Sequence, residues 1–409
     1  MVSKRMKLLA GAAAILVAAA GCGSSTSSGA GSGGHTYTVG VLTDLTGPAA
    51  SGNKTAPQGV QAGTVLATKQ GYTIKYVVAD TMTSPSGALS AAQKLVQQDH
   101  VLAVIANSAL TFSAAPYLTS QGIPVIGAAS DGPEWITSKN MFSVFGPLDQ
   151  TKVATTLGEL FKMQGATVVG TLGYSIAPVS AMAAKATAIS AQAAGLRAGY
   201  VNANFPFGST NVQPVALAMK SAGVDGVTAS ADPNTNFALV TALRQVGANP
   251  RIAVFATGYG GDLAQAGPGA LQAAQNVYFE SAWEPVEMHT AATQQFQSAL
   301  KSVGITGDPT YGEYVGYTSI AMLVQGLQAA GSSPSHAGLI KALSGITNFN
   351  AAGLFGNHTL NLGQRTGIVV GVDNCQWVTK LSGSTFEPVG GAIPICGSVI
   401  PGKTVSPSS

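Results

Sequence analysis

Short apolar runs rich in β-branched residues alternate with longer amphipathic segments along most of the chain. Within 150–164, for example, Val153, Leu157 and Leu160 fall on one face of a helix. Similar spacing predicts helices at 85–98, 178–194, 210–223, 234–247 and 289–303. The apolar runs predict strands at 38–42, 73–79, 101–106, 123–128, 166–172, 226–230, 251–257 and 277–281.

The order of these segments predicts an α/β protein with parallel, doubly wound sheets. Strands separated by helices form parallel βαβ units, and eight strands over this length fit two sheets better than one. After Thr347 the chain changes to short runs with Gly and Asn turns, which are typical of antiparallel strands. We expect this segment to add a hairpin to a lobe built earlier, so that the lobes are discontinuous.

The first residues have the organisation of an export signal. Lys4, Arg5 and Lys7 precede an uncharged run of 13 residues, Leu8–Ala20. That run is too short to span a bilayer as a helix but has the length of a signal-peptide core. Small residues then lead to Cys22, in the order of a bacterial lipobox, so we expect 1–21 to be removed and Cys22 to carry the lipid. The alternative is an ordinary cleavage site that happens to precede a cysteine.

Both ends of the mature chain are predicted to lack a fixed structure. The segment 22–36 is made almost entirely of Gly, Ser, Thr and Ala. Such a segment cannot bury apolar surface, so it is expected to be a flexible tether between the lipid and the folded body. Residues 401–409 are expected to be a disordered tail.

Two further cysteines, Cys375 and Cys396, are predicted to form a disulfide in an exported chain. It would close a loop of about 20 residues and stabilise the C-terminal segment by roughly 3 kcal/mol. Two buried thiols are the alternative. The five histidines are scattered without ligand spacing, so neither a metal site nor a cofactor is expected.

Composition narrows the classes of partner. Hydrophobic residues make up 46% and charged residues 9% of the chain, which indicates a folded body. The formal charge of +3 includes the three basic residues of the signal, so the mature chain is close to neutral. Without a basic stripe, binding to nucleic acid is not expected. No P-loop follows a strand, so this chain is not expected to hydrolyse ATP, and any ATP hydrolysis linked to its function would be carried out by a different protein.

Polar side chains follow several of the predicted strands. Ser108 comes after the third strand, and Ala129, Ser130 and Asp131 come after the fourth. The corresponding residues in the second half are Tyr174, Asp232 and Tyr259. Ligands of open parallel sheets bind beyond the carboxyl ends of the strands, so these residues are candidates to bind a small polar solute. For each Ser or Asp, a role as an ordinary helix N-cap is the alternative.

Three segments carry a resemblance to a known family: VGVLTDLTGPAASG (39–52), SALTFSAAPYLTSQGIPVIGAASDGPEW (108–135) and VDGVTASADPNTNFALVTALRQVGA (224–248). They resemble type I periplasmic binding proteins of the leucine/isoleucine/valine-binding family, from about Tyr37 to Cys396. The resemblance implies two Rossmann-like lobes that close over a ligand and are joined by three crossovers, near 146–149, 281–284 and 348–356. Lobe 1 would then comprise 37–147 and 284–350, and lobe 2 would comprise 148–283 and 351–400.

The same resemblance implies a function. The chain would be the solute-binding lipoprotein of an ABC importer, a monomer that captures an amino acid or related small polar solute. Its partners would be the membrane permease subunits and, through the lipid on Cys22, the outer face of the cell membrane.

The resemblance also carries over residue by residue. Ser108 and Ala129 match positions that grip the ligand carboxylate in the amino-acid binders. Asp131 replaces a family Thr, and Tyr259 replaces the Glu that pairs with the ammonium group. Asp232 replaces a family Tyr, so leucine specificity does not follow. We expect Asp131 or Asp232 to take a cationic or hydroxyl group of the ligand, and the walls to be supplied by Tyr174, Tyr259 and Trp135.

Two other functions fit parts of the sequence. A sensor of the same fold could present a ligand-dependent surface to a membrane receptor. Gly173–Ala177 also resembles the nucleophile elbow of serine hydrolases, with Ser175 as the nucleophile, but its last Gly is Ala and no His is placed as a base. The prediction is therefore a binding protein and not an enzyme.

Overall fold

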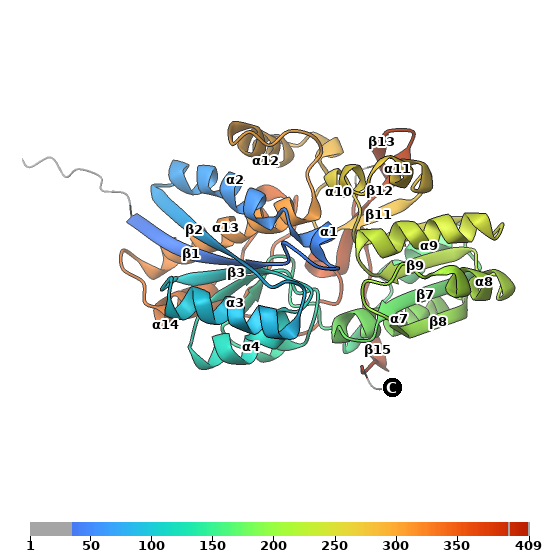
Figure 1. The fold of residues 1–409 in the computed structure, drawn as a ribbon, viewed down its shortest axis with the longest axis horizontal. Coiled ribbons are helices and arrows are strands. Elements are labelled where there is room, and N and C mark those ends of the chain that lie inside the picture. Colours follow the sequence, from blue (N-terminus) through green and yellow to red (C-terminus); the bar gives the residue numbers. More distant parts are fainter. Residues whose placement is uncertain (1–34, 392, 408–409) are drawn as a thin grey trace, which may run out of the picture. The chain divides into compact units, whose positions relative to one another are not determined.

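The computed structural model describes residues 35–391 and 393–407, and these residues form one compact unit (Figure 1). The predicted signal peptide, Cys22 and nearly all of the predicted tether lie outside the described residues. Within the described ranges, no helix combines the length and the apolar character needed to cross a membrane.

The first sheet contains five parallel strands in the order β2-β1-β3-β4-β5. These are β1 (His35–Thr43), β2 (Tyr72–Asp80), β3 (Ala103–Asn107), β4 (Val125–Gly127) and β5 (Met141–Ser143). Strands β3 and β4 are buried throughout, as expected when helices cover both faces of a parallel sheet. The covering helices are α2 (Ala56–Lys69) and α13 (Tyr311–Ala330) on one side, with α3 (Pro85–Gln97) and α4 (Thr111–Ser120) on the other (Figure 1).

Helix α13 brings the C-terminal half of the chain back to the first sheet. It begins with a capping box, in which Thr310 and Glu313 each bond the other's backbone N–H. A Cβ added to Gly59 of α2 would lie 2.2 Å from the Glu313 carbonyl oxygen, so the close approach of α2 and α13 requires glycine there. Two more helices join this layer: α12 (Ala291–Ser302) packs on α2, and α14 (His336–Ser344) packs on α13.

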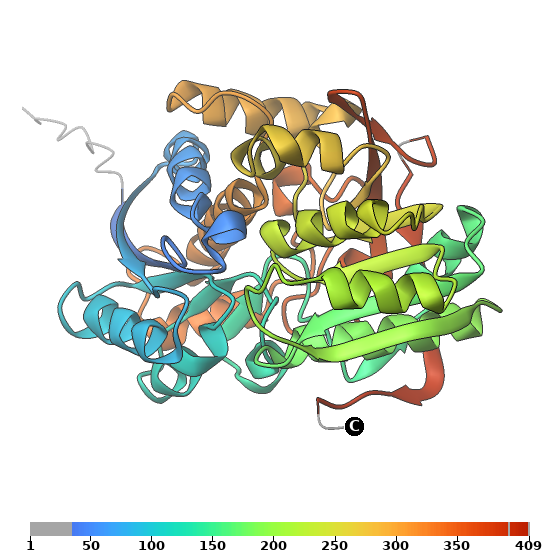
Figure 2. The ribbon, with the colours of Figure 1, turned by 45° about the vertical axis from the view of Figure 1, so that its right-hand side comes forward.

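The second sheet has the order β13-β12-β11-β10-β9-β7-β8. Its parallel part consists of β7 (Val168–Tyr174), β8 (Arg197–Phe205), β9 (Gly226–Ser230), β10 (Ile252–Phe255) and β11 (Tyr278–Ser281). The hairpin β12 (Cys375–Ser382) and β13 (Thr385–Pro388) extends it antiparallel to β11, and β14 (Ile395–Cys396) pairs with β12. Two helix pairs pack at this sheet: α6 (Thr156–Met163) with α7 (Pro178–Ala193), and α8 (Gln213–Ser221) with α9 (Pro233–Gln245) (Figure 2).

The remaining elements are short. They are α1 (Ala50–Asn53), α5 (Glu134–Thr137), β6 (Lys152–Ala154), α10 (Gly261–Gln265), α11 (Pro268–Ala273), the 3₁₀ helices η1 (Val286–Met288), η2 (Ala351–Gly353) and η3 (Val372–Asn374), and β15 (Val399–Thr404).

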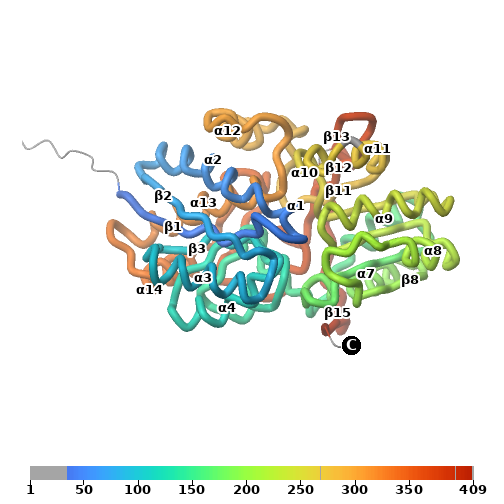
Figure 3. The backbone as a smooth tube through the Cα atoms, viewed as in Figure 1, coloured from blue at the N-terminus to red at the C-terminus, as the bar shows by residue number. Residues whose placement is uncertain are grey.

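Each of the two large sheets, with the helices packed on it, forms one lobe. Three connections join the two lobes (Figure 3). The chain leaves the first lobe after β5, returns after β11 and leaves again after α14. The connections lie against one another: the Asp149 N–H donates to the Ile368 carbonyl over 2.7 Å, and the Glu284 N–H donates to the Leu354 carbonyl over 2.8 Å. The predicted class, two α/β lobes with doubly wound parallel sheets and three crossovers, is confirmed. The predicted lobe boundaries stay a prediction.

The eight predicted strands are present to within a few residues, and three expectations need correction. The helix expected at 150–164 begins only at Thr156, because Lys152–Ala154 forms β6. The tail expected to be disordered at 401–409 is ordered over 401–404, where β15 pairs with β6. Strand β1 begins at His35, inside the predicted tether. The polar ends of β1 and β15 show no apolar alternation, so backbone pairing with neighbouring strands holds them.

Candidate ligand-binding site

A cavity of about 260 Å³ lies at the carboxyl ends of strands from both sheets. The residues that end or follow these strands and line it include Ala109, Ser130, Tyr174, Asp232 and Tyr259. The lobes touch beside it, where the Val179 N–H donates to the Asp131 carbonyl over 3.1 Å. The cavity is therefore walled by both lobes.

Aromatic rings form much of the wall. Trp283 is 2% exposed and stacks on Tyr314, with 5.5 Å between the ring centroids. Phe145 meets Trp283 edge-on at 5.4 Å. Burial raises the pKa of the Tyr311 and Tyr314 phenols, so both stay neutral hydrogen-bonding groups. Such a wall suits a ligand with an apolar body.

Asp232 lines the cavity but is occupied by protein partners. It is the N-cap of α9, and its Oδ1 accepts the Thr235 N–H over 3.1 Å. Its Oδ2 accepts the hydroxyls of Tyr174 and Thr235. Burial and this carboxylate raise the pKa of Tyr174. Asp232 therefore positions α9 and the Tyr174 ring, the N-cap role that the sequence left open.

Tyr259 is also held by the protein. Its hydroxyl donates to Glu287 Oε2 over 2.5 Å and accepts the Val286 N–H over 3.2 Å. Burial raises its pKa well above the usual value, and the neighbouring Tyr314 and Glu287 act in the same direction. The ring, rather than the hydroxyl, is what Tyr259 presents to the cavity.

Ser108 does not line the cavity. It is fully buried, and its hydroxyl donates to Asp44 Oδ1 over 2.6 Å. Asp44, also fully buried, accepts three more hydrogen bonds, from the Ala109 N–H over 2.9 Å, from the Asn53 amide over 2.8 Å and from the Thr81 hydroxyl. An internal carboxylate thus takes the Ser108 donor that the family resemblance assigns to a ligand carboxylate.

Asp131 and Ala129 are likewise buried behind the wall, whereas Ser130 is exposed and lines the cavity. Asp131 Oδ2 accepts the Phe112 N–H over 2.7 Å, and Oδ1 accepts the Trp135 indole N–H over 3.1 Å. Burial raises the pKa of both Asp131 and its neighbour Glu134, and the charge of Asp131 raises the pKa of Glu134 further. Trp135 is fully buried against this pair and is not a wall of the cavity.

Sequence reasoning missed Glu280, which lines the cavity from β11. Its Oε2 is buried and has no hydrogen-bond partner among the described residues. Burial raises the pKa of Glu280 to about 7, and a hydrogen bond from the Gln376 side chain opposes the shift. The signal was a charged residue inside an otherwise apolar strand, VYFES, where a sequence pattern gives no reason for it.

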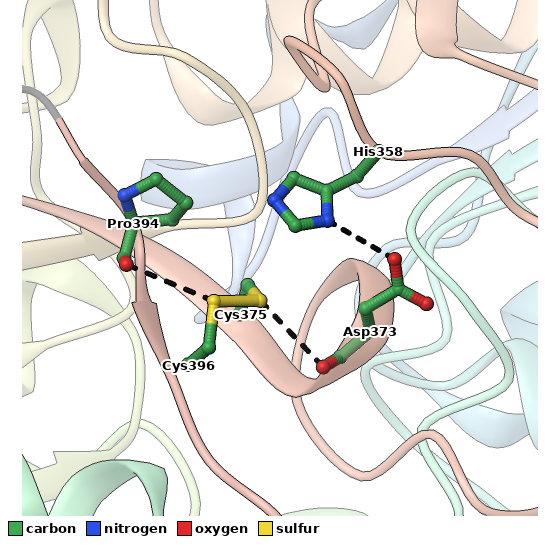
Figure 4. Close-up of polar contacts among 5 residues, drawn as sticks. All are labelled: His358, Asp373, Cys375, Pro394 and Cys396. Atoms are coloured by element: carbon green, nitrogen blue, oxygen red, sulfur yellow. Dashed lines mark hydrogen bonds and ion pairs between the residues drawn. A yellow bond between two sulfur atoms is a disulfide. The ribbon is translucent and has the colours of Figure 1, made fainter.

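Two other candidate chemistries have no support in the described residues. Ser175 is exposed and has no hydrogen bond to any described histidine. Cys375 and Cys396 form the predicted disulfide, and His358 lies close by with its Nδ1 3.0 Å from Asp373 Oδ2 (Figure 4). Because both sulfurs are bonded to each other, this cluster is not a set of free metal ligands.

The chain is similar to known solute-binding proteins. A family model described as "Periplasmic binding protein" matches residues 36–381. A solute-binding protein from R. palustris, solved with 4-hydroxybenzoate, is 16% identical, with a TM-score of 0.70 over 91% of this chain and 96% of that one. A leucine binding protein from Thermotoga maritima MSB8 is also 16% identical, with a TM-score of 0.70 over 88% of this chain and 99% of that one. No curated protein sequence matches the chain.

Proposed function

Because the chain belongs to the periplasmic binding protein family, we propose that it is the solute-capturing subunit of an ABC importer, working outside the cytoplasm. Members of this family bind solutes, and the chain is a binding protein and not an enzyme. The partners we propose are the membrane permease subunits, which would receive the solute from the closed protein.

The observation that carries this proposal is the cavity walled by both lobes. A ligand there contacts strand ends of both sheets only when the lobes are together, so it shifts the population towards the closed form. Closure is a hinge motion, and the three adjacent connections are the segments able to absorb it. A permease that docks on the closed form would then recognise the loaded protein.

The solute we propose is an amino acid or a related small molecule with an amine or hydroxyl group. Proteins of this fold include one that binds leucine and one solved with 4-hydroxybenzoate. The lining of the cavity must therefore select the ligand, because the fold does not. The polar groups of that lining include hydroxyls, amides and the carboxylates of Asp232 and Glu280, and the carboxylates favour hydrogen-bond donors on the ligand.

A thermal-shift screen tests this function. The purified protein is heated with amino acids, amides, amines, polyamines, sugars and aromatic acids. A ligand present at 100 times its dissociation constant stabilises the native state by about 2.7 kcal/mol. We expect saturable stabilisation without turnover by at least one small solute. Absence of stabilisation by the whole panel would count against a solute-binding role.

We also propose that the protein is anchored by lipid on Cys22. Cys22 follows an export signal and small residues in the order of a lipobox. We expect Cys22→Ser to move the protein from the membrane fraction to the soluble extracytoplasmic fraction of the cells. Ser27→Ala is the matched control, because it changes a residue of the same segment and keeps Cys22, and it should leave the protein at the membrane. Membrane retention of Cys22→Ser would contradict the proposal.

A further inference from the structure

The charged side chains that line the cavity are all acidic. Two acidic side chains, Asp232 and Glu280, line it, and no Lys, Arg or His of the described residues does so. A carboxylate brought into this cavity would lose its hydration without meeting a counter-charge, which is strongly unfavourable. An ammonium group would meet carboxylates and aromatic faces, both of which attract it.

Three hydrogen-bond donors at the N-terminus of α4 that could have held an anion are already engaged by the protein. At the N-terminus of α4, the Ala109 N–H and the Ser108 hydroxyl donate to Asp44, and the Phe112 N–H donates to Asp131. Both acceptors are fully buried. Two carboxylates of the protein, Asp44 and Asp131, therefore already occupy the positive end of this helix. A carboxylate of a ligand could not bind to the same donors.

The two acidic groups of the wall differ in what they can still accept. Every carboxylate oxygen of Asp232 already accepts a hydrogen bond from Tyr174 or Thr235. Glu280 Oε2 is buried and unpartnered among the described residues, and the indole Nε1 of Trp283 in the same wall is also buried without a partner. Of the two carboxylates in the wall, Glu280 is thus the one with an oxygen that accepts no hydrogen bond from the described residues.

We propose that the ligand carries a cationic amine on an apolar body and no free carboxylate, and that Glu280 selects it. The amine lies against Glu280, and the apolar body lies among the rings of Tyr174, Tyr259, Trp283 and Tyr314. This inference rests on the proposed function. Of the ligand class given there, it retains the related amines and excludes amino acids with a free carboxylate.

Four probes with one apolar body separate the alternatives. Phenethylamine carries the amine alone, phenylalanine carries the amine and a carboxylate, 3-phenylpropanoate carries the carboxylate alone, and 2-phenylethanol is neutral. Binding of each to the full protein is measured by calorimetry at pH 8. We expect phenethylamine to bind at least roughly 10-fold more tightly than 2-phenylethanol, and 3-phenylpropanoate to bind most weakly, because a hydrogen bond to a charged group is the stronger kind.

The residue is tested by Glu280→Gln, which keeps the shape and removes the charge. We expect phenethylamine affinity to fall by roughly 10-fold or more and 2-phenylethanol affinity to change little. Glu387→Gln is the matched control, since Glu387 is exposed on β13 of the same sheet. A variant that merely distorted the cavity would lower the affinity for both probes equally, and that result would overturn the role of Glu280.

The outcomes also separate this inference from the proposed function. Binding of 3-phenylpropanoate or phenylalanine at least as tight as that of phenethylamine overturns the inference but leaves solute capture standing. Binding of a carboxylic acid or sugar from the thermal-shift panel, with none by any amine, does the same. Failure of every compound counts against solute capture itself, and the inference falls with it.

Discussion

At the residue scale, the main feature is the number of carboxyl groups held away from water. Burial raises the pKa of Asp131, Glu134, Asp262 and Glu280. A raised folded-state pKa means that the group's contribution to stability is complete below its unfolded pKa, near 4, and is lost as the pH rises through the folded value. We therefore expect the free energy of unfolding to fall from pH 5 to pH 9.

The substitution Glu134→Gln tests one member of this group. Glutamine cannot ionise, so folding of the variant does not require the protonation of a carboxyl that is ionised in the unfolded chain, as folding of the wild type does at Glu134. We expect the variant to be more stable than the wild type by about 1–3 kcal/mol at pH 9, with the difference shrinking towards pH 4. Urea unfolding at several pH values measures this, and Glu387→Gln, at an exposed site, should show no such trend. A difference independent of pH would contradict the assignment.

Of the seven residues that the sequence proposed for the site, four line the cavity and Ser108, Ala129 and Asp131 do not. Ser130, Tyr174, Asp232 and Tyr259 line the cavity because any residue just beyond a parallel strand is near the ligand edge. Whether such a side chain faces the cavity depends on hydrogen-bond partners that are distant in sequence. The Ser108 hydroxyl donates to Asp44, and the Tyr174 hydroxyl donates to Asp232. Glu280 lies within a strand, so a search of strand ends could not find it.

At the scale of elements, the disulfide ties β14 to β12. Cys375 and Cys396 are paired in register and are 21 residues apart in sequence. Removing the link frees that loop in the unfolded chain, so we expect Cys375→Ser/Cys396→Ser to lower stability by about 3 kcal/mol. Urea unfolding measures the loss. Dithiothreitol should reproduce it in the wild type and have no further effect on the variant. Equal stability of variant and wild type would show that the loop is held by its other contacts.

The elements themselves followed largely from the sequence. The predicted helix at 178–194 matches α7, and the predicted strand at 226–230 matches β9, because apolar periodicity there agrees with burial. The strands that the sequence pattern failed to predict lie at the edges of sheets. Strand β8, which was not predicted, has only two buried residues, Ala203 and Phe205, and β15 is mostly exposed. Such strands are held by backbone hydrogen bonds, which leave little trace in side-chain pattern.

At the scale of the whole folded body, substitutions at two glycines can test whether ligand binding requires the two lobes to come into contact. Gly208 has φ +66°, and a Cβ there would lie 2.4 Å from Pro48 Cβ on the other lobe. Gly223 has φ +69°, but its nearest neighbour is 3.8 Å away. Both alanine variants bear the same backbone strain of roughly 1 kcal/mol, and only Gly208→Ala obstructs the contact between lobes.

We therefore expect Gly208→Ala to weaken binding of a ligand found in the screen by roughly 10-fold, because it disfavours the closed state. Gly223→Ala should leave affinity unchanged while lowering stability by a similar amount. Calorimetry gives the affinities, and small-angle scattering gives the contraction on binding, which should be smaller in Gly208→Ala. Equal affinity in the two variants would show that this contact is not part of closure.

Asp44 has a consequence for how the ligand range of such a protein could change. Its side chain is chemically an acetate ion attached to the backbone, held by four donors from Asn53, Thr81, Ser108 and Ala109. Asp44→Gly would detach that ion and leave its donors unmatched beside the cavity. Free acetate should then restore part of the lost stability, a chemical rescue that the wild type cannot show. Asp44, which does not line the cavity, would thereby determine whether these four donors bind a carboxylate of the protein or a carboxylate of the ligand.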